Sequence, residues 1–209
     1  MSTQEILRLV LTALAAYALG NINPAILIGR ARGIDIRKEG SGNAGMTNTI
    51  RVMGLGAGIA VLVIDVLKAF ISVRIGFALA GKAGAMTAFA AVVIGHCYPA
   101  AFGFRGGKGV AASLGAALAL NWPSALAALC IAGVLFAVTR KMSVGSLAAA
   151  LAYPVIMWFC APEYGWFAVF AAVFLMLTHL GNIKRIAKGE EKELTIGDPG
   201  RDTGEEGGE

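Results

Sequence analysis

Long apolar stretches separated by short polar gaps are the feature of this sequence that most restricts its fold. Seven such stretches cover residues 6–28, 54–76, 83–101, 109–121, 122–139, 143–160 and 164–181. Charged residues make up only 15% of the chain, whereas a soluble domain has about 25%, and about 20 apolar helical residues are enough to cross a bilayer. The sequence therefore predicts an all-α integral membrane protein with seven transmembrane helices. The fourth stretch is short for a crossing at about 1.5 Å per residue, so a short, tilted or partly re-entrant helix stays open there.

The positions of lysine and arginine predict the orientation in the membrane. All 18 of these residues fall in alternate gaps or after the last stretch, except Arg8, Lys68, Arg74 and Lys82. Because cytoplasmic segments carry the excess of basic residues, we predict the N-terminus outside and the C-terminus in the cytoplasm. The same distribution explains the net charge of +5. No basic face with aromatic platforms accompanies it, so we expect no nucleic-acid partner.

The chain divides into a membrane part and a polar end. We predict a single transmembrane domain over residues 1–186 and a disordered, acidic cytoplasmic tail over residues 187–209, which are polar and rich in glycine. The three cysteines, Cys97, Cys130 and Cys160, are far apart and follow no metal-ligand spacing. We therefore expect no disulfide framework and no zinc site.

A basic, glycine-rich turn lies between two apolar stretches, in the segment GFRGGKGVAAS (103–113). This segment is not the P-loop of nucleotide-binding proteins, because the residue five before Gly107 is Phe102 and no strand precedes it. Clustered glycines still let backbone N–H groups converge on an anion. A helix that begins near Lys108 would add its positive N-terminal end. Phosphate binding and a plain interfacial turn with cytoplasmic cations are both compatible with this stretch alone.

Two more donor-rich segments are predicted on the same side of the membrane. The segment GSGNAGMTNTIR (40–51) offers many side-chain donors, of which Thr47 and Asn48 could instead cap a helix. The segment THLGNIKR (178–185) places His179, Asn182 and Arg185 at a spacing of three residues, which keeps them near one helix face. Three donor-rich segments on one side of the membrane favour a site for anions.

Other polar residues lie close to these segments. Asp65 and Lys68 are three residues apart within the second apolar stretch. Charges inside a membrane are costly, so this pair is either functional or a mutually neutralising ion pair that locks helix packing. Ser143 follows two basic residues, and it either caps the next helix or adds a hydroxyl group to the site.

These motifs resemble those of a known family. SGNAGMTNTIR (41–51), GHCYPAAFGFRGGKGVA (95–111) and HLGNIKR (179–185) are similar to the three motif regions of the bacterial acyl-phosphate-dependent glycerol-3-phosphate acyltransferases, the PlsY family. GNINPAILIGR (20–30) and DVLKA (65–69) look like further family segments. The similar segments follow the same order as in the family and extend from about residue 5 to residue 186, so the acidic tail lies outside the resemblance. Met46, Ala69 and Arg105 depart from the residues usual in the family, and none of these changes removes a functional group.

The resemblance implies a location and a reaction. Members of this family are multi-pass proteins of the bacterial cytoplasmic (inner) membrane, with the active site on the cytoplasmic side. They transfer a fatty acyl group from acyl phosphate to the sn-1 hydroxyl of glycerol 3-phosphate. The products are lysophosphatidate and phosphate, and the reaction is the first acylation of phospholipid synthesis. The family uses no metal, acyl-CoA or acyl carrier protein, so the resemblance implies no metal and no cofactor here. We therefore expect the two substrates and the lipid bilayer as partners, and a monomer.

Roles for individual residues follow as hypotheses, because a site for two phosphates needs donors and positive charge. The residues assigned to catalysis are Ser41, Arg51, Lys108, His179 and Asn182. Those assigned to the substrate phosphates are Ser41, Gly42, Asn43, Thr47, Asn48, Arg51, Arg105, Gly106, Gly107, Lys108, Gly109 and Ser143. His179 is the first candidate for the general base, and a substrate phosphate oxygen is its rival. The residues assigned to structure or loop shape are His96, Pro99, Asp65 and Lys68.

Two other classes of protein fit part of the sequence. A transporter of small phosphorylated metabolites predicts paired polar sites near the bilayer midplane and an inverted repeat, whereas the donors here cluster at one face. A purely structural or partner-binding subunit predicts no dense donor clusters in three separate loops. The sequence therefore favours the acyltransferase.

Overall fold

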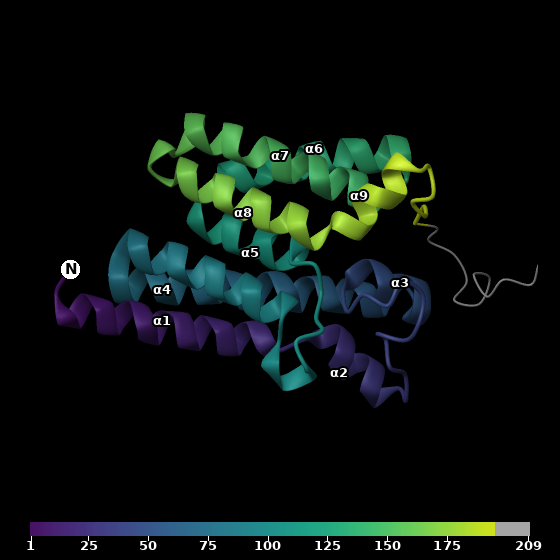
Figure 1. Ribbon diagram of the computed structural model, residues 1–209, viewed down its shortest axis with the longest axis horizontal. Coiled ribbons are helices and arrows are strands. Elements are labelled where there is room, and N and C mark those ends of the chain that lie inside the picture. The colour runs from purple at the N-terminus through teal and green to yellow at the C-terminus, as the bar shows by residue number, and fades with distance from the viewer. Residues whose placement is uncertain (195–209) are drawn as a thin grey trace, which may run out of the picture.

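The computed structural model describes residues 1–194, and every regular element within them is a helix (Figure 1). The longer elements are α1 (Thr3–Asn21), α4 (Leu55–Cys97), α5 (Val110–Leu120), α6 (Trp122–Thr139), α7 (Met142–Cys160) and α8 (Gly165–Thr178). The shorter ones are α2 (Pro24–Ala31), α3 (Met46–Met53), α9 (Leu180–Ala187) and the 3-10 turns η1 (Ala100–Phe102) and η2 (Pro162–Tyr164). The all-helical prediction is confirmed over this part of the chain.

The long element α4 is a hairpin of two helical arms. Ala80 and Gly81 have non-helical backbone angles, and Gly81 has a φ of +58°, a left-handed value that glycine adopts without steric cost. The arms, 55–79 and 82–97, lie side by side, because a side chain at Gly76 or Gly84 would collide with the backbone of the opposite arm. This turn explains the polar gap between the second and third apolar stretches.

Small residues let the neighbouring helices approach α4 closely. A side chain at Gly95 would collide with the carbonyl of Tyr17 in α1, and a side chain at Gly115 in α5 would collide with the carbonyl of Val66. In lipid, apolar burial alone gives helices little reason to associate, so such close packing holds them together. As a result α5 lies between a layer of α1 and α4 and a layer of α6, α7 and α8 (Figure 1).

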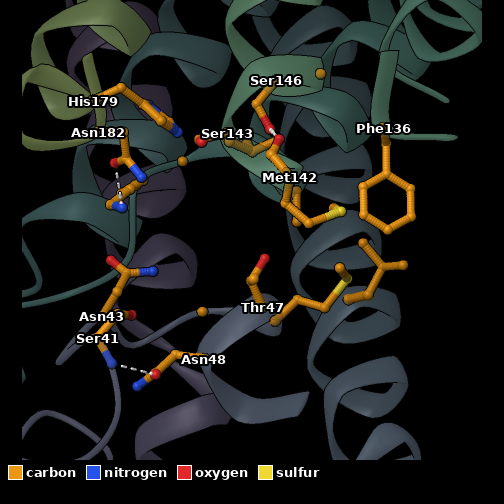
Figure 2. A pocket seen from close by; sticks show the side chains of 18 of the residues that line it. Ser41, Asn43, Thr47, Asn48, Phe136, Met142, Ser143, Ser146, His179 and Asn182 are labelled. Atoms are coloured by element: carbon orange, nitrogen blue, oxygen red, sulfur yellow. Dashed lines mark hydrogen bonds between the residues drawn. The ribbon is translucent and has the colours of Figure 1, made fainter. Parts of the chain in front are cut away.

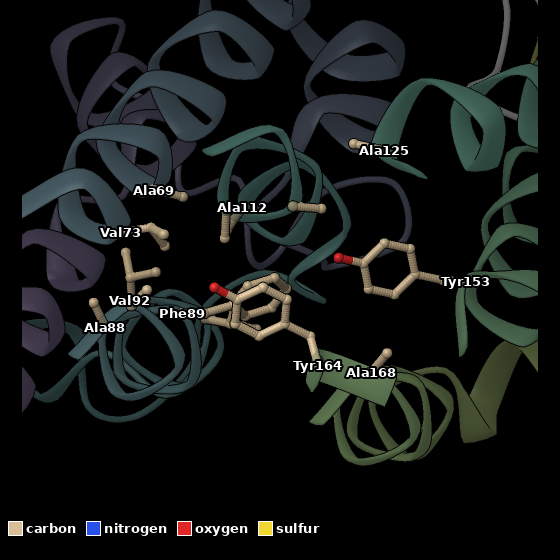
Figure 3. Close-up of a cluster of buried hydrophobic side chains, with 14 of the residues drawn as sticks. Ala69, Val73, Ala88, Phe89, Val92, Ala112, Ala125, Tyr153, Tyr164 and Ala168 are labelled. Carbon is tan, nitrogen blue, oxygen red and sulfur yellow. The ribbon is translucent and has the colours of Figure 1, made fainter. Parts of the chain in front are cut away.

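A core of small and aromatic side chains fills the junction between the layers (Figure 3). Phe89 of α4 packs edge-to-face on Phe167 of α8, with the ring centroids 5.1 Å apart. Ala112 of α5 and Ala168 of α8 are completely buried in the same cluster. The alanines leave room for the rings, so the short helix α5 is enclosed on both sides.

Within residues 1–194, four helical segments are long and apolar enough to cross a membrane: Thr3–Ala31, Leu55–Phe102, Trp122–Thr139 and Met142–Cys160. A fifth is obtained if the bent pair Pro162–Thr178 and Leu180–Ala187 is one span, and α5 is shorter. Large apolar side chains such as Leu14, Leu67 and Trp166 are exposed on the outer faces, as expected of helices that contact lipid. The protein is therefore membrane-embedded, while the number of seven spans and the direction of the termini stay predictions.

Two apolar stretches are broken where the sequence analysis treated them as continuous. In the stretch 6–28, α1 ends at Asn21 and the side chain of Asn23 caps a second helix that begins at Pro24. Proline suits this position because the first turn of a helix leaves its N–H groups unpaired. The stretch 164–181 bends by 66° at His179, between α8 and α9. These breaks place α2, α3 and α9 at one end of the molecule, opposite the N-terminus (Figure 1).

Candidate active site

A cavity of about 670 Å³ opens among these short helices, and it is lined by the three donor-rich segments (Figure 2). Its wall includes all five residues that the sequence analysis assigned to catalysis: Ser41, Arg51, Lys108, His179 and Asn182. It also includes Asn43, Thr47, Asn48, Gly109 and Ser143. Figure 2 shows the residues of the 41–48 segment facing His179, Asn182 and Ser143 across the open space. The fold thus brings together segments that are far apart in the sequence.

Some residues assigned from the sequence lie off the cavity wall, namely Gly42, Lys68, Pro99, Arg105, Gly106 and Gly107. The side chain of Arg105 is exposed to solvent. Gly106 and Gly107 donate backbone hydrogen bonds to the end of α4 instead. Direct contact between these residues and a phosphate stays a prediction.

The glycine loop before α5 is held against the end of α4 by its backbone. The N–H groups of Gly106 and Gly107 each donate to a carbonyl, of Cys97 and His96 respectively, at 3.1 Å. A side chain at Gly107 would collide with the imidazole Nε2 of His96. Gly109 has a φ of +88°, which favours glycine, and α5 begins at the next residue without a side-chain cap. The positive N-terminal end of α5 therefore faces the cavity, where it favours an anion.

Lys108 connects this loop to the C-terminal part of the chain. Its ammonium group donates to the side-chain oxygen of Asn182, and its carbonyl accepts a hydrogen bond of 2.8 Å from the hydroxyl of Thr178. Burial lowers the pKa of Lys108, and the neighbouring positive charge of Arg185 acts in the same direction. A partly buried cation beside a second cation is poorly compensated, so it favours the arrival of an anion such as phosphate.

The segment before α3 is shaped by Asn48, which is completely buried. Its side-chain nitrogen donates to the carbonyls of Ile36 and Glu39 at 3.1 and 3.0 Å, and its oxygen accepts from the N–H of Ser41 at 2.8 Å. These bonds use the amide within the protein, and they hold Ser41 at the cavity wall. Contact of Asn48 with a phosphate stays a prediction.

His179 lies at the bend between α8 and α9 and points into the cavity (Figure 2). Its Nδ1 lies 2.8 Å from the carbonyl oxygen of Leu175 and 3.2 Å from the hydroxyl of Thr178. Since a carbonyl oxygen only accepts hydrogen bonds, Nδ1 carries the proton in this arrangement. The other ring nitrogen, Nε2, is therefore left as the acceptor, which is the form that a general base requires.

The segment after α9 supplies a carboxylate that the sequence analysis did not assign to the site. Oε1 of Glu191 accepts hydrogen bonds from Ser143 and Asn182, both at 2.6 Å, and Oε2 accepts from Nε of Arg185 at 2.7 Å. Burial acts to raise the pKa of Glu191, but these three hydrogen bonds outweigh burial and lower the pKa overall. The glutamate is therefore a carboxylate at neutral pH that fixes the orientation of three polar side chains.

The same segment also reaches α3 and the turn between α6 and α7. Arg51 donates to the carbonyls of Lys192 and Glu193 at 3.4 and 3.3 Å. The N–H of Leu194 donates to the carbonyl of Arg140 at 2.9 Å, and its side chain is buried. These contacts fall within the region 187–209 that was predicted as a disordered tail, and the rest of that prediction, 195–209, lies outside the described residues.

A buried charged cluster lies behind the glycine loop. Asp65 accepts from Lys68 at 2.7 Å, and Nδ1 of His96 lies 3.2 Å from the same carboxylate oxygen. Lys68 also donates to the carbonyls of Gly20 and Ile22, where α1 ends. Asp65 and Lys68 thus form a mutually neutralising ion pair, which is one of the two interpretations that the sequence allowed. The cluster connects both arms of α4 to the break after α1 and supports the ring of His96 that packs against the loop.

The cavity combines this polar rim with an apolar wall. Leu62, Leu129 and Phe136 line the part that faces the helices, while Arg51, Lys108 and Arg185 contribute positive charge. Such a space suits a molecule with an anionic head and an apolar chain, because the head needs charge-assisted hydrogen bonds and the chain needs apolar surroundings. The fold and the site therefore define an integral membrane protein with a cavity suited to anionic, chain-bearing molecules.

Comparison with known proteins narrows this class to one family. A family model described as glycerol-3-phosphate acyltransferase matches residues 10–189. The glycerol-3-phosphate acyltransferase of Jannaschia sp. (strain CCS1) is 43% identical over 190 residues, which cover 90% of this chain and 94% of that protein. The enzyme of Gloeobacter violaceus is 40% identical over 193 residues, covering 88% and 93%. The chain belongs to the glycerol-3-phosphate acyltransferase family, which confirms the resemblance seen in the motifs.

Solved structures agree with this assignment. The crystal structure of PlsY (YgiH), an integral membrane glycerol 3-phosphate acyltransferase, in its glycerol 3-phosphate form matches with a TM-score of 0.86 and 31% identity. The match covers 90% of this chain and 96% of that one. The lysophosphatidic acid form matches with a TM-score of 0.83 and 30% identity. The helical arrangement described above is therefore that of an integral membrane acyltransferase.

Proposed function

We propose that this protein transfers a fatty acyl group from acyl phosphate to the sn-1 hydroxyl of glycerol 3-phosphate, releasing lysophosphatidate and inorganic phosphate. The observation that carries the proposal is that cations from three distant segments face an apolar wall in the same cavity. A PlsY structure has been solved in a glycerol 3-phosphate form and in a lysophosphatidic acid form, which supports the same acceptor and product here. An acyl phosphate donor and a glycerol 3-phosphate acceptor each carry one phosphate. The positive charge of Arg51, Lys108 and Arg185 at the cavity suits two such groups.

The proposed reaction needs positioning more than acid assistance. The sn-1 hydroxyl oxygen forms a bond to the acyl carbonyl carbon while the bond from that carbon to the phosphate oxygen breaks. Phosphate leaves with the electron pair, and the hydroxyl proton goes to Nε2 of His179 or to a substrate phosphate oxygen. Because phosphate is a good leaving group, fixed donors and charges around the reacting atoms supply most of the catalysis.

The residues of the cavity take the following parts in this proposal. Lys108, the N-terminal end of α5 and Ser41 bind one phosphate, and Arg51 binds the second. Asn182 orients the glycerol hydroxyls beside His179. In the described structure Asn182 is fixed from both sides, since it accepts from Lys108 and donates to Glu191. A substrate hydroxyl would therefore meet an amide whose position is already set.

We also propose how the protein lies in the membrane. The seven crossings are α1, the two arms of α4, α5, α6, α7 and α8, each of which corresponds to one apolar stretch of the sequence. The N-terminus is outside and the cavity faces the cytoplasm, because the basic gaps all fall on that side. The location is the bacterial cytoplasmic membrane, with residues 1–186 and the segment 187–194 that packs on them as one catalytic domain of a monomer.

The donor and acceptor can be tested on the purified protein in detergent. We would supply palmitoyl phosphate and glycerol 3-phosphate without metal, follow phosphate release, and run palmitoyl-CoA in parallel. The proposal predicts phosphate release that requires glycerol 3-phosphate, equal amounts of lysophosphatidate, and no product from palmitoyl-CoA. Release without the acceptor would make the protein a hydrolase, and turnover with palmitoyl-CoA alone would overturn the proposed donor.

The assignment of residues is tested by alanine substitutions with a charge-matched control. Lys108→Ala and Arg51→Ala should each lower kcat/KM by about tenfold or more, the cost of one charge-assisted contact. Lys184→Ala removes a cation from an exposed position on α9, off the cavity wall, and should stay close to the wild type. If His179→Ala keeps most of its kcat, the general base is a substrate phosphate and not His179.

A further inference from the structure

A second, smaller cavity continues from the candidate site into the interior of the helix bundle. Its volume is about 110 Å³, and it is lined by residues of α5, α6, α7, α8 and the second arm of α4. Its residues are almost all apolar, many of them alanine, and none is charged. The residues that line both cavities are Val110, Leu114, Leu129, Ala132 and Ser146. The smaller cavity, which we call the crevice, is therefore an extension of the site and not a separate void.

The helices show in which direction the crevice runs. On α7 it extends from Ser146 to Tyr153, and on α6 from Ala132 back to Ala125. Seven residues of helix correspond to about 10 Å. On α5, α6 and α7, which contribute the residues shared with the candidate site, those residues lie at one end of the lining, so the crevice leads away from the polar rim. Tyr153 and Ala125 lie at its far end, and Figure 3 shows both side chains in the buried cluster between the layers.

Tyr153 is the large side chain at this far end. The residue is 7% exposed, and its hydroxyl group has no hydrogen-bond partner among the described residues. A buried phenol usually finds a partner, and without one no hydrogen bond holds the ring in place. The position of the ring therefore depends on packing, and the ring forms part of the wall at the far end of the crevice.

We infer that the crevice receives the terminal carbons of the fatty acyl chain and that the Tyr153 ring limits how far the chain can enter. The inference rests on the proposed acyl transfer, since it places the chain of the same substrate whose phosphate lies at the polar rim. By comparison with an apolar cavity of roughly 150 Å³ that admits benzene, the crevice holds about four carbon atoms. An apolar void of this kind stays dry, and a methylene chain would restore the dispersion contacts that an empty void lacks.

Selection by the crevice is steric and not a matter of hydrophobic transfer. A chain that does not enter the protein lies in lipid or detergent, which is as apolar as the crevice, so entry gains little from desolvation. The shape of the crevice is what distinguishes chains, because a chain too long for it must bend or leave. A hydrophobic pocket discriminates by roughly tenfold or more per misplaced methylene. The protein should therefore show a preferred chain length that the residues of the crevice determine.

Two pairs of variants test this with the assay described above, using lauroyl, palmitoyl and stearoyl phosphate. Ala128→Leu fills the crevice from α6, and Ala127→Leu adds the same group to the exposed outer face of that helix. We expect Ala128→Leu to lower the palmitoyl-to-lauroyl ratio of kcat/KM by about tenfold, and Ala127→Leu to leave it unchanged. Tyr153→Leu shortens the stop and should shift the preference toward stearoyl phosphate, whereas Tyr153→Phe keeps the ring and should keep the wild-type preference.

The outcomes separate the two proposals. If the wild type turns over acyl phosphates and Ala128→Leu changes the ratio no more than Ala127→Leu, the crevice does not hold the chain and the inference fails alone. If Ala128→Leu does not fold, the pair at Tyr153 decides, and equal preferences for Tyr153→Leu and Tyr153→Phe overturn the inference. If the wild type turns over no acyl phosphate, the proposed function fails and this inference fails with it.

Discussion

The substitution Glu191→Gln tests whether the segment after α9 is part of the folded domain. The two side chains have nearly the same shape, but glutamine presents an NH₂ group in place of one carboxylate oxygen. Its remaining oxygen can still accept from Ser143 and Asn182, as Oε1 of Glu191 does. The NH₂ group then faces Nε of Arg185, which is also a donor, so one charge-assisted hydrogen bond is lost.

The size of the effect follows from this lost bond. A hydrogen bond to a charged group contributes about 1.5–3 kcal/mol. The side chain of Arg185 is 41% exposed while that of Glu191 is 8% exposed, and solvent screening of the arginine brings the expected loss to about 1–2 kcal/mol. At about 2–4 °C per kcal/mol for a chain of this size, the midpoint of thermal unfolding should fall by roughly 3–6 °C.

The assay is thermal unfolding in detergent, with Glu193→Gln as the matched control. Glu193 is exposed and lies two residues further along. Arg51 donates to its backbone carbonyl, which the substitution does not change. The control loses the same charge from the same segment and should unfold at the wild-type temperature. If Glu191→Gln unfolds within about 1 °C of Glu193→Gln, the carboxylate does not hold the site together and the reasoning is refuted.

The pH dependence of this stabilisation has a definite sign. Because its hydrogen bonds lower the pKa of Glu191 in the folded protein, the contribution is fully present above the ordinary pKa of a glutamate. It is lost as the pH falls through the lowered folded value. The difference in unfolding temperature between the wild type and Glu191→Gln should therefore be constant near neutral pH and shrink in acid.

Three further results are expected from features of the site. Gly107→Ala places a methyl group against Nε2 of His96 and should therefore displace the glycine loop. We expect KM for glycerol 3-phosphate, measured from initial rates, to rise about tenfold or more. Asp65→Leu should destabilise the protein by about 3–5 kcal/mol, because it leaves the buried charge of Lys68 unpaired. The double variant Asp65→Leu with Lys68→Leu should unfold at a higher temperature than Asp65→Leu. Because burial lowers the pKa of Lys108, the alkaline limb of kcat/KM for glycerol 3-phosphate should lie below the ordinary pKa of lysine. It should move to higher pH in Lys108→Arg.

The sequence predicted the helical elements well and their breaks less well. Every apolar stretch contains helix in the structure, because a backbone in lipid must satisfy its hydrogen bonds internally. Hydropathy reports only that a residue prefers lipid and says nothing about chain direction, so it could not distinguish a continuous helix from one bent at His179. The break at Asn23 did have a local signal, since asparagine before proline is typical of a helix start.

The sequence predicted the hydrogen-bond donors and cations that line the candidate site, but it did not predict the carboxylate that holds them. Ser41, Arg51, Lys108 and His179 come from segments where donors are dense against an apolar background, so they stood out in the sequence. Glu191 lies among glycines and other acidic residues, where composition favours a disordered tail. What identifies it is the geometry, because its carboxylate meets Asn182 and Arg185 from α9 and Ser143 from α7. No pattern along the chain relates these positions.

The contacts of Lys108 have a consequence for how the protein is made. This residue enters the membrane region near the middle of the chain, yet its ammonium group and its carbonyl are both held by residues from Thr178 onward. A nascent chain on the ribosome has inserted most of its helices before these partners are synthesised. Its glycine loop is then attached only to the end of α4, and Asn182 lacks its hydrogen bond to a carboxylate until Glu191 has been added. The anion site therefore assembles only after the residues from Thr178 to Glu191 have been made.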